Sequence, residues 1–182
     1  MVLDFSIEKC SVPITHDPKS QYELFQINVD GTDSIRRMLT VVTKPDSTVA
    51  GKWFSEVLRG KTCNASPPLN GFQADSIFVG LVAEEDLANA CLDNRVKAQA
   101  RPLNMLSISV GGDCLMLAMD VSGHLSKAVR EFLNHPRVVV FGTDMSQLVN
   151  RLQTIHDVTI KSGVDLNQLA VASFDRSGSL RP

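Results

Sequence analysis

The stretch FVGLVAEED, from Phe78 to Asp86, decides the fold, because in it a strand-like segment ends in a cluster of acids. The apolar run from Ile77 to Val82 is typical of a strand buried inside a sheet. Glu84, Glu85 and Asp86 follow almost directly. Carboxylates clustered at a strand end are either ligands for a divalent metal ion or a solvated acidic corner. The pattern therefore raises the question of whether this is a metal site or what remains of one.

Length and composition indicate one globular domain. The chain has 182 residues, which a single hydrophobic core can organise. Its 43% hydrophobic and 21% charged residues are ordinary for a soluble protein. We expect residues 1–182 to form a single domain, with 1–19 and 175–182 flexible and a loop at 61–75.

Charge and hydropathy disfavour two classes of partner. The formal net charge is -2, and no run of Lys and Arg is longer than Arg36-Arg37, whereas proteins that bind phosphates usually show a basic stripe. No apolar run approaches the roughly 20 residues of a membrane span, and the first residues, MVLDFSIEKC, lack the pattern of a secretory signal. We expect a nuclear or cytoplasmic protein that does not contact a membrane.

The cysteines show no metal-binding spacing, so we expect reduced thiols, with Cys91 and Cys114 in the core.

Hydrophobic periodicity and turn residues predict strands that alternate with helices. We expect hairpins at 22–29 with 35–43 and at 104–110 with 114–119, and single strands at 77–82, 137–141 and 158–160. Helices are predicted from Asp46 or Ser47 to Leu58, and over 87–101, 122–133, 144–155 and 165–174. This order predicts an α/β fold with a mixed sheet and helices on both faces.

With these residues in place, the chain resembles the Werner-type branch of the DEDD 3′–5′ exonucleases, in its plant-like form, over residues 13–174. SIFVGLVAEE at 76–85 is similar to the family strand V-G-(L/F)-D-(I/V)-E-W. RPLNMLSISVGGDCLMLAM at 101–119 resembles the hairpin that follows it, FLNHPRVVVFGTDMSQLVNRL at 132–152 resembles the second motif, and GVDLNQLA at 163–170 its sequel. The resemblance implies a ribonuclease H-like fold that lacks the family's last helices.

The family's chemistry depends on four acids, and the resemblance indicates where each would fall. The first falls on Val82, the second on Glu84, which is retained, and the third on Leu148. The fourth acid, with a Tyr or His general base, would lie beyond the last residue of this chain. Asp144 occupies a position where the family usually has Gly, so it does not replace a ligand in simple register.

One retained acid out of four implies a protein without nuclease chemistry. Two divalent cations about 4 Å apart repel each other unless several carboxylates neutralise them. We therefore expect a catalytically inactive exonuclease-like protein that needs no cofactor and acts through protein–protein interaction. The alternatives are a nucleic-acid-binding protein and a weakly active exonuclease in which Glu84, Asp86 and Asp144 together bind Mg²⁺ or Mn²⁺.

Two further expectations concern histidines and partners. We interpret the four histidines, His16, His124, His135 and His156, as capping or surface residues, because each stands alone near the end of a predicted element. The family's last helices cover part of the sheet, and apolar surface left uncovered favours association. We therefore expect a homo-oligomer or a complex with a protein partner, with nucleic acid as the weaker alternative.

Overall fold

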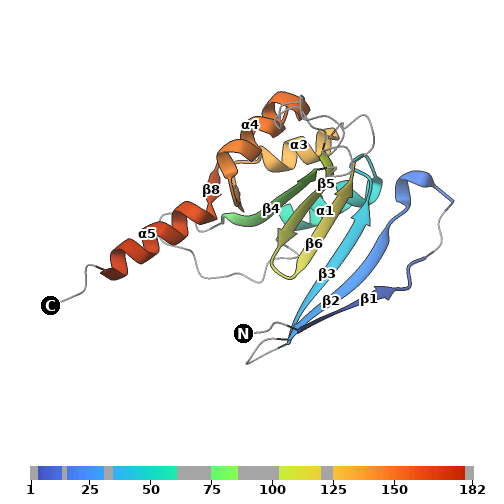
Figure 1. Cartoon of the computed structure of the whole chain (residues 1–182). Helices are drawn as coiled ribbons and strands as arrows, with labels where there is room; N and C mark the ends of the chain where they lie inside the picture. The colour runs from blue at the N-terminus through green and yellow to red at the C-terminus, as the bar shows by residue number, and fades with distance from the viewer. Residues whose placement is uncertain are drawn as a thin grey trace, which may run out of the picture.

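The computed structural model describes residues 4–13, 16–30, 35–60, 75–85, 103–119 and 125–178. Its centre is one sheet of eight strands, in the order β1-β2-β3-β6-β5-β4-β7-β8 (Figure 1). The strands are β1 (Asp4–Cys10), β2 (Glu23–Asp30), β3 (Ile35–Thr43), β4 (Ile77–Glu85), β5 (Leu103–Val110), β6 (Asp113–Ala118), β7 (Val138–Gly142) and β8 (Gly163–Asp165). The helices are α1 (Thr48–Leu58), α3 (Lys127–Leu133), α4 (Met145–His156) and α5 (Leu166–Gly178), with a 3₁₀ turn, η1 (Pro18–Ser20).

The sheet is mixed, as the sequence predicts. β1, β2 and β3 form an antiparallel ribbon, and β3 joins β6 in parallel. β5 pairs in antiparallel fashion with both of its neighbours, β6 and β4, while β4, β7 and β8 are parallel. Both predicted hairpins are confirmed, since β2 pairs with β3 and β5 pairs with β6.

A serine caps the start of α1 and another caps α3, and aromatic rings pack the two helices against each other. The Ser47 hydroxyl accepts a hydrogen bond from the Ala50 N–H at 3.0 Å at the start of α1, which satisfies one of the free donors of the first turn. Phe54 of α1 stacks on Phe132 of α3 with ring centroids 4.6 Å apart, and Trp53 meets both rings edge to face. This aromatic cluster contributes to the core under the sheet.

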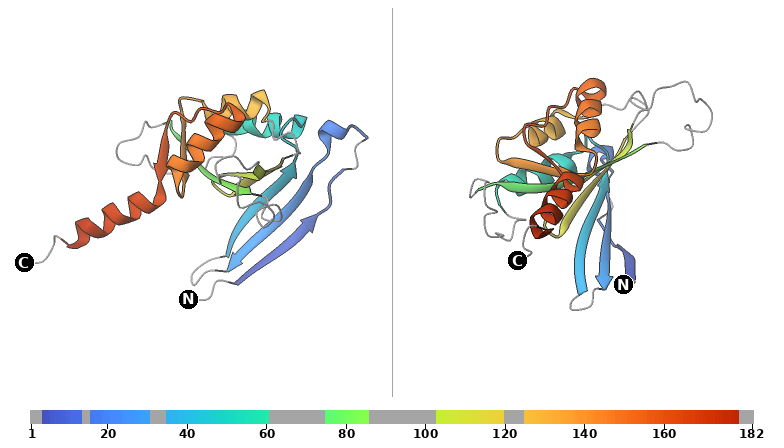
Figure 2. Two further views of the ribbon diagram at one scale, coloured as in Figure 1. Left: turned by 45° about the horizontal axis from the view of Figure 1, so that its top comes forward. Right: turned by 60° about the vertical axis from the view of Figure 1, so that its left-hand side comes forward.

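The helices that pack on the sheet share one of its faces. Alternate residues of β4 are buried on that face, namely Ile77, Val79 and Leu81. They form one hydrophobic cluster with buried side chains of α1, α3 and α4. On the other face of the sheet Phe78 and Phe141 are half-buried, with their rings edge to face at 5.7 Å, and Val82 is exposed. We expected helices on both faces, but residues 166–172 of α5 are exposed, and the left view of Figure 2 shows α5 leading away from the sheet, as does Figure 1.

A glycine allows α4 to approach the sheet closely. A side-chain carbon on Gly142 would lie 2.9 Å from the Leu81 carbonyl oxygen and 2.8 Å from the Met145 sulfur. Contacts this short are not tolerated by real side chains, so β7 ends in the residue type that lets the first turn of α4 pack against β4. This close approach determines the geometry of the edge where β4 and β7 end.

The structure corrects several predicted boundaries. Residues 4–10 were expected to be flexible but form β1, paired with β2 along its whole length. No strand forms at 158–160. Val158 and Ile160 are buried, but the chain pairs with β7 only further on, at β8. The third helix begins after Ser126, which caps it, rather than at Ser122, and α5 extends past Phe174 to Gly178.

Other predictions fall outside the described residues. These are the helix at 87–101, most of the loop at 61–75, Asp86, Ser122 and Cys91. Cys114 is buried as predicted, at 8% exposure. No helix in the described part of the chain is long and apolar enough to cross a membrane.

Candidate functional site

A pocket forms at the edge of the sheet where β4 and β7 end. The two strands run in parallel, from Ile77 opposite Val138 to Gly80 opposite Phe141, so their carboxyl ends lie at the same edge. Beyond β7 the chain turns through Thr143 into α4. The pocket between β4 and the start of α4 has a volume of about 230 Å³. This is below the roughly 300–1,000 Å³ that is usual for small-molecule sites.

The described residues that line this pocket come from three places. β4 contributes Leu81, Val82 and Ala83, the turn after β7 contributes Thr143 and Asp144, and α4 contributes Gln147, Leu148 and Arg151. The structure therefore brings together three of the positions that the sequence singled out, Val82, Leu148 and Asp144. Two of these three side chains are apolar.

Leu148 faces inward because of its place on α4. Met145, Leu148 and Leu152 follow one another at helical spacings and are all buried, with Leu148 9% exposed. Leu148 belongs to the same hydrophobic cluster as the core of the sheet. Val82 on β4 is 57% exposed at the rim of the pocket. The two positions thus differ in character, since Leu148 is packed and Val82 borders solvent.

Asp144 is held in an unusual backbone conformation. Its φ is +51°, in the left-handed region that favours glycine, which suits a position where the resembling family has Gly. Its carbonyl oxygen accepts hydrogen bonds from the N–H groups of Gln147 and Leu148 at 3.0 and 3.1 Å. Its carboxylate makes no capping bond to the helix. Asp144 supplies the one carboxylate among the described lining residues.

Glu84, which the resemblance aligns with the second family acid, lies at the end of β4 outside the described lining of the pocket. Its side chain is exposed, and it shares a face of the strand with Val82 because side chains alternate along a strand. The pairing of β4 with β5 becomes irregular between Glu84 and Glu85. The proposed cation site of Glu84, Asp86 and Asp144 is therefore only partly described: Glu84 and Asp144 are not brought together in the pocket, and Asp86 lies outside the described residues.

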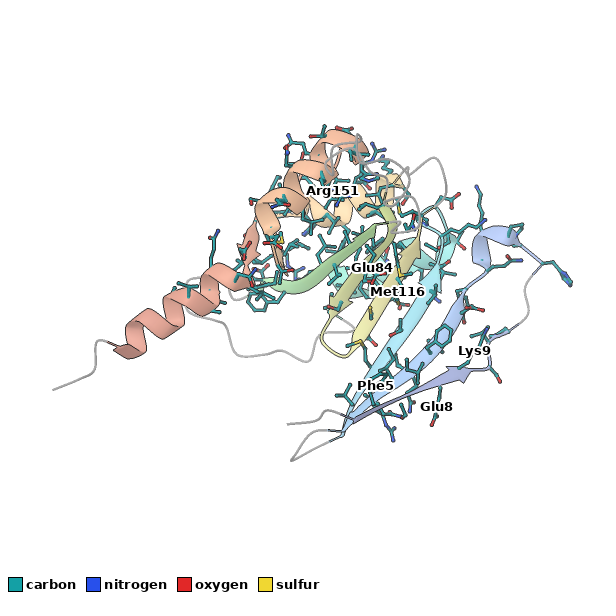
Figure 3. The ribbon with its side chains drawn as sticks, in the orientation of Figure 1. Phe5, Glu8, Lys9, Glu84, Met116 and Arg151 are labelled. Carbon is teal, nitrogen blue, oxygen red and sulfur yellow. The ribbon has the colours of Figure 1, made fainter. Side chains whose placement is uncertain are left out.

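Arg151 is a pocket residue that we did not single out from the sequence. It follows Leu148 by three residues on α4, a spacing that places both on the same side of the helix. Figure 3 shows Arg151 on α4 and Glu84 at the end of β4. The guanidinium group of Arg151 is always protonated, so the pocket contains a positive charge as well as the Asp144 carboxylate. The helical spacing from Leu148 was the signal that could have identified it.

The three described histidines are not among the residues that line the pocket. His135 Nδ1 accepts a hydrogen bond from the Arg137 N–H at 3.3 Å, which agrees with a capping role at a turn. His16 is exposed, as predicted. His156 is the last residue of α4 and is buried at 5% exposure, which contradicts the surface alternative for this residue but not the capping one. His124 lies outside the described residues.

Among the described residues, no group of three or more His, Cys, Asp or Glu side chains is placed to share a metal ion.

Asp165, at the end of β8, has a structural role at the start of α4. It accepts hydrogen bonds from the N–H groups of Met145, at 2.9 Å, and of Asn167 and Gln168. The bond from Met145, together with those from Gln168 and Asn167, lowers the pKa of Asp165. Asp165 thus connects the first turns of α4 and α5.

The strand arrangement identifies the class of fold. The antiparallel β6-β5-β4 unit followed by parallel β7 and β8 forms the ribonuclease H-like mixed α/β sheet that the resemblance implies. No family model matches the chain, and no curated protein matches it.

Among solved structures, the chain is similar to the EXD2 exonuclease domain. The form soaked in Mn and dGMP aligns with a TM-score of 0.49 and 16% identity, over 74% of this chain and 60% of that domain. The form soaked in Mg and GMP aligns with a TM-score of 0.47 and 14% identity, over 70% of this chain and 55% of that domain. The chain thus spans little more than half the length of these structures.

Proposed function

We propose that this chain is a degenerate Werner-type exonuclease-like protein that lacks nuclease activity and acts through protein–protein interaction. One observation carries the proposal. Val82 and Leu148, the positions where the resemblance places the first and third family acids, line one pocket with apolar side chains. The position of the lost third acid is also packed into the core, because Leu148 belongs to the main hydrophobic cluster.

The charges around the pocket also oppose binding of a cation pair. Divalent cations in nucleases need several carboxylates to offset their mutual repulsion. Asp144 provides one negative charge among the described lining residues, and Arg151 provides a positive charge in the same pocket. Glu84 is exposed and lies outside that lining. A metal ion entering here would find one carboxylate among the described lining residues, which cannot offset the mutual repulsion of two divalent cations.

The energetic consequence is large. Each 1.36 kcal/mol of lost transition-state stabilisation slows a reaction about tenfold, and a bound metal supplies several kcal/mol. The loss of two acids at the pocket is therefore expected to lower a family-like rate by about a thousandfold or more. A protein with this fold would then keep a surface for partners without the chemistry.

A nuclease assay tests the proposal. Single- and double-stranded oligonucleotides with a 5′ label are incubated with excess protein and Mg²⁺ or Mn²⁺, in parallel with Glu84→Gln. Asp157→Asn is a matched control, because Asp157 is an exposed acid just beyond the far end of α4. We expect no shortening from the 3′ end with any of the three proteins.

Two other results would change the function. Shortening that EDTA abolishes, and that Glu84→Gln loses while Asp157→Asn keeps it, would establish the weakly active exonuclease and contradict the proposal. A gel shift that weakens with salt, without cleavage, would instead establish nucleic-acid binding.

A further inference from the structure

β1 is an edge strand whose outer side is free for pairing in the described structure. Its inner side pairs with β2 from Asp4 opposite Asp30 to Cys10 opposite Leu24, without irregularity. No described strand pairs with its outer side, and Figure 1 shows β1 as the outermost strand. An edge strand presents a row of N–H and C=O groups that can extend a sheet, and proteins often block it with a proline or a bulge. β1 has neither.

The same strand exposes large apolar side chains. Phe5 is 67% exposed and Ile7 is 57% exposed. Both lie on one face of the ribbon, because they are two residues apart, and they stand opposite Val29 and Ile27 of β2. β1 and β2 pack against neighbouring strands rather than against a described helix. Apolar side chains on an open edge are characteristic of an interaction surface.

We propose that β1 pairs in antiparallel fashion with β1 of a second copy of this chain, about a two-fold axis at Ile7, so that two sheets join into one. The sequence DFSIEKC suits this arrangement because its two halves complement each other. In this register Ile7 faces Ile7 of the second copy, Phe5 faces Lys9, Ser6 faces Glu8 and Asp4 faces Cys10. All seven residues are paired, and no like charges stand opposite each other.

Neighbouring registers are less favourable. Side chains of directly opposed residues point to the same face of a sheet, so the two-fold axis passes through a residue. An axis at Ser6 places Asp4 opposite Glu8, and an axis at Glu8 places two glutamates opposite each other. Like charges directly opposed across strands are destabilising. The charges of β1 therefore select Ile7 as the centre.

The Phe5–Lys9 pair across the proposed interface already occurs once within the chain. Lys9 stands opposite Phe25 in the β1–β2 ladder, with its Nζ 5.7 Å from the centre of the ring. Lys9 also forms a salt bridge with Glu23 on β2. A lysine on an edge strand usually repels a second strand, but the Glu23 carboxylate offsets the charge of this one.

This surface is separate from the pocket. β4 is the sixth strand from the β1 edge of the sheet. Figure 3 shows Phe5, Glu8 and Lys9 along β1, away from Glu84 and Arg151. The proposed pairing therefore does not depend on whether the pocket binds a metal ion, and a failed dimer test leaves the nuclease result unaffected.

Light scattering after size-exclusion chromatography tests the dimer. At micromolar concentration we expect wild type to have twice the 19.9 kDa mass of the chain. Ile7→Lys places two positive charges at the axis and should give a monomer. Val171→Lys is the matched control, because Val171 is 61% exposed on α5, and it should remain dimeric. Circular dichroism confirms that both variants are folded. A monomeric wild type, or a dimer that Ile7→Lys leaves intact, would overturn the proposal.

Disulfide cross-linking tests the register. The background carries Cys10→Ser, Cys63→Ser and Cys91→Ser and retains the buried Cys114. Residues directly opposed across antiparallel strands have Cα atoms about 4.5–5.5 Å apart, which suits a disulfide. On mild oxidation Ile7→Cys should form a covalent dimer, as should a mixture of Ser6→Cys with Glu8→Cys. Self-linking of Glu8→Cys in place of Ile7→Cys, or no linking by any variant, would refute the axis at Ile7.

Discussion

Truncating the two apolar residues of the pocket should have very different effects, because Leu148 is packed and Val82 is not. Leu148→Ala removes three carbon atoms from a side chain that is 9% exposed. At about 0.8 kcal/mol for each buried carbon, the transfer loss is about 2.4 kcal/mol. The cavity left behind adds to it, so we expect a destabilisation of about 2.5–4 kcal/mol. Val82→Ala removes two carbons from a side chain that is 57% exposed, which corresponds to less than about 1 kcal/mol.

Urea unfolding followed by circular dichroism measures the free energy of unfolding of both variants, and heating the same samples gives their melting temperatures. For a chain of this size, 1 kcal/mol shifts the melting temperature by about 2–4 °C. Leu148→Ala should therefore melt at least about 5 °C below wild type, and Val82→Ala within about 4 °C of it. Equal losses for the two variants would refute the distinction between a packed and a rim position. Leu148→Asp provides a second check: if its stability equals that of wild type, the pocket accepts a carboxylate and is not filled by the leucine.

Three further predictions concern the surroundings of the pocket. Gly142→Ala should lower the free energy of unfolding by about 1–3 kcal/mol through overpacking. Gly51→Ala, where nothing lies within 4 Å, should leave that free energy unchanged or raise it, and equal losses for the two variants would contradict the close contact at Gly142. Burial raises the pKa of Cys114 to about 11, so at pH 8 Ellman's reagent should modify the partly exposed Cys10 well before Cys114. Mass spectrometry measures the labelling of each cysteine, and equal labelling of the two would contradict the burial of Cys114. The hydrogen bonds that Asp165 accepts lower its pKa, so their contribution to stability is present above the ordinary aspartate pKa and is lost as pH falls through the lowered value. An NMR titration of the Asp165 carboxyl with a midpoint at or above about 3.9 would contradict the lowered pKa.

Local patterns predicted most of the sheet because the buried strands carry strong signals. The hairpins, the β4 strand and the helices over Thr48–Leu58 and Met145–His156 follow from alternation, helical spacing and capping residues. β1 escaped detection because an edge strand of seven residues has one neighbour and carries few apolar side chains. The strand predicted at 158–160 was wrong because local burial does not determine strand pairing. Val158 and Ile160 are buried like strand residues, but the residues that pair with β7 are those of β8, further along the chain.

The pocket was predictable in part. Val82, Asp144 and Leu148 converge because the ends of parallel strands and the helix that follows lie at one edge of the sheet. The position of Glu84 outside the described lining could not be inferred, since β4 becomes irregular just after it and this depends on its pairing with β5. Arg151 was not predicted as a site residue, although its three-residue spacing from Leu148 places both on the same side of α4.

Binding of Mn²⁺, followed by electron paramagnetic resonance, shows whether the pocket holds a divalent cation, because this measurement depends on neither substrate nor turnover. We predict that the signal of free Mn²⁺ is unchanged when wild-type protein is added in excess, and that Glu84→Gln behaves identically. A loss of the free signal at micromolar metal, reversed in Glu84→Gln and Asp144→Asn, would show a working cation site and contradict the proposed loss of metal binding.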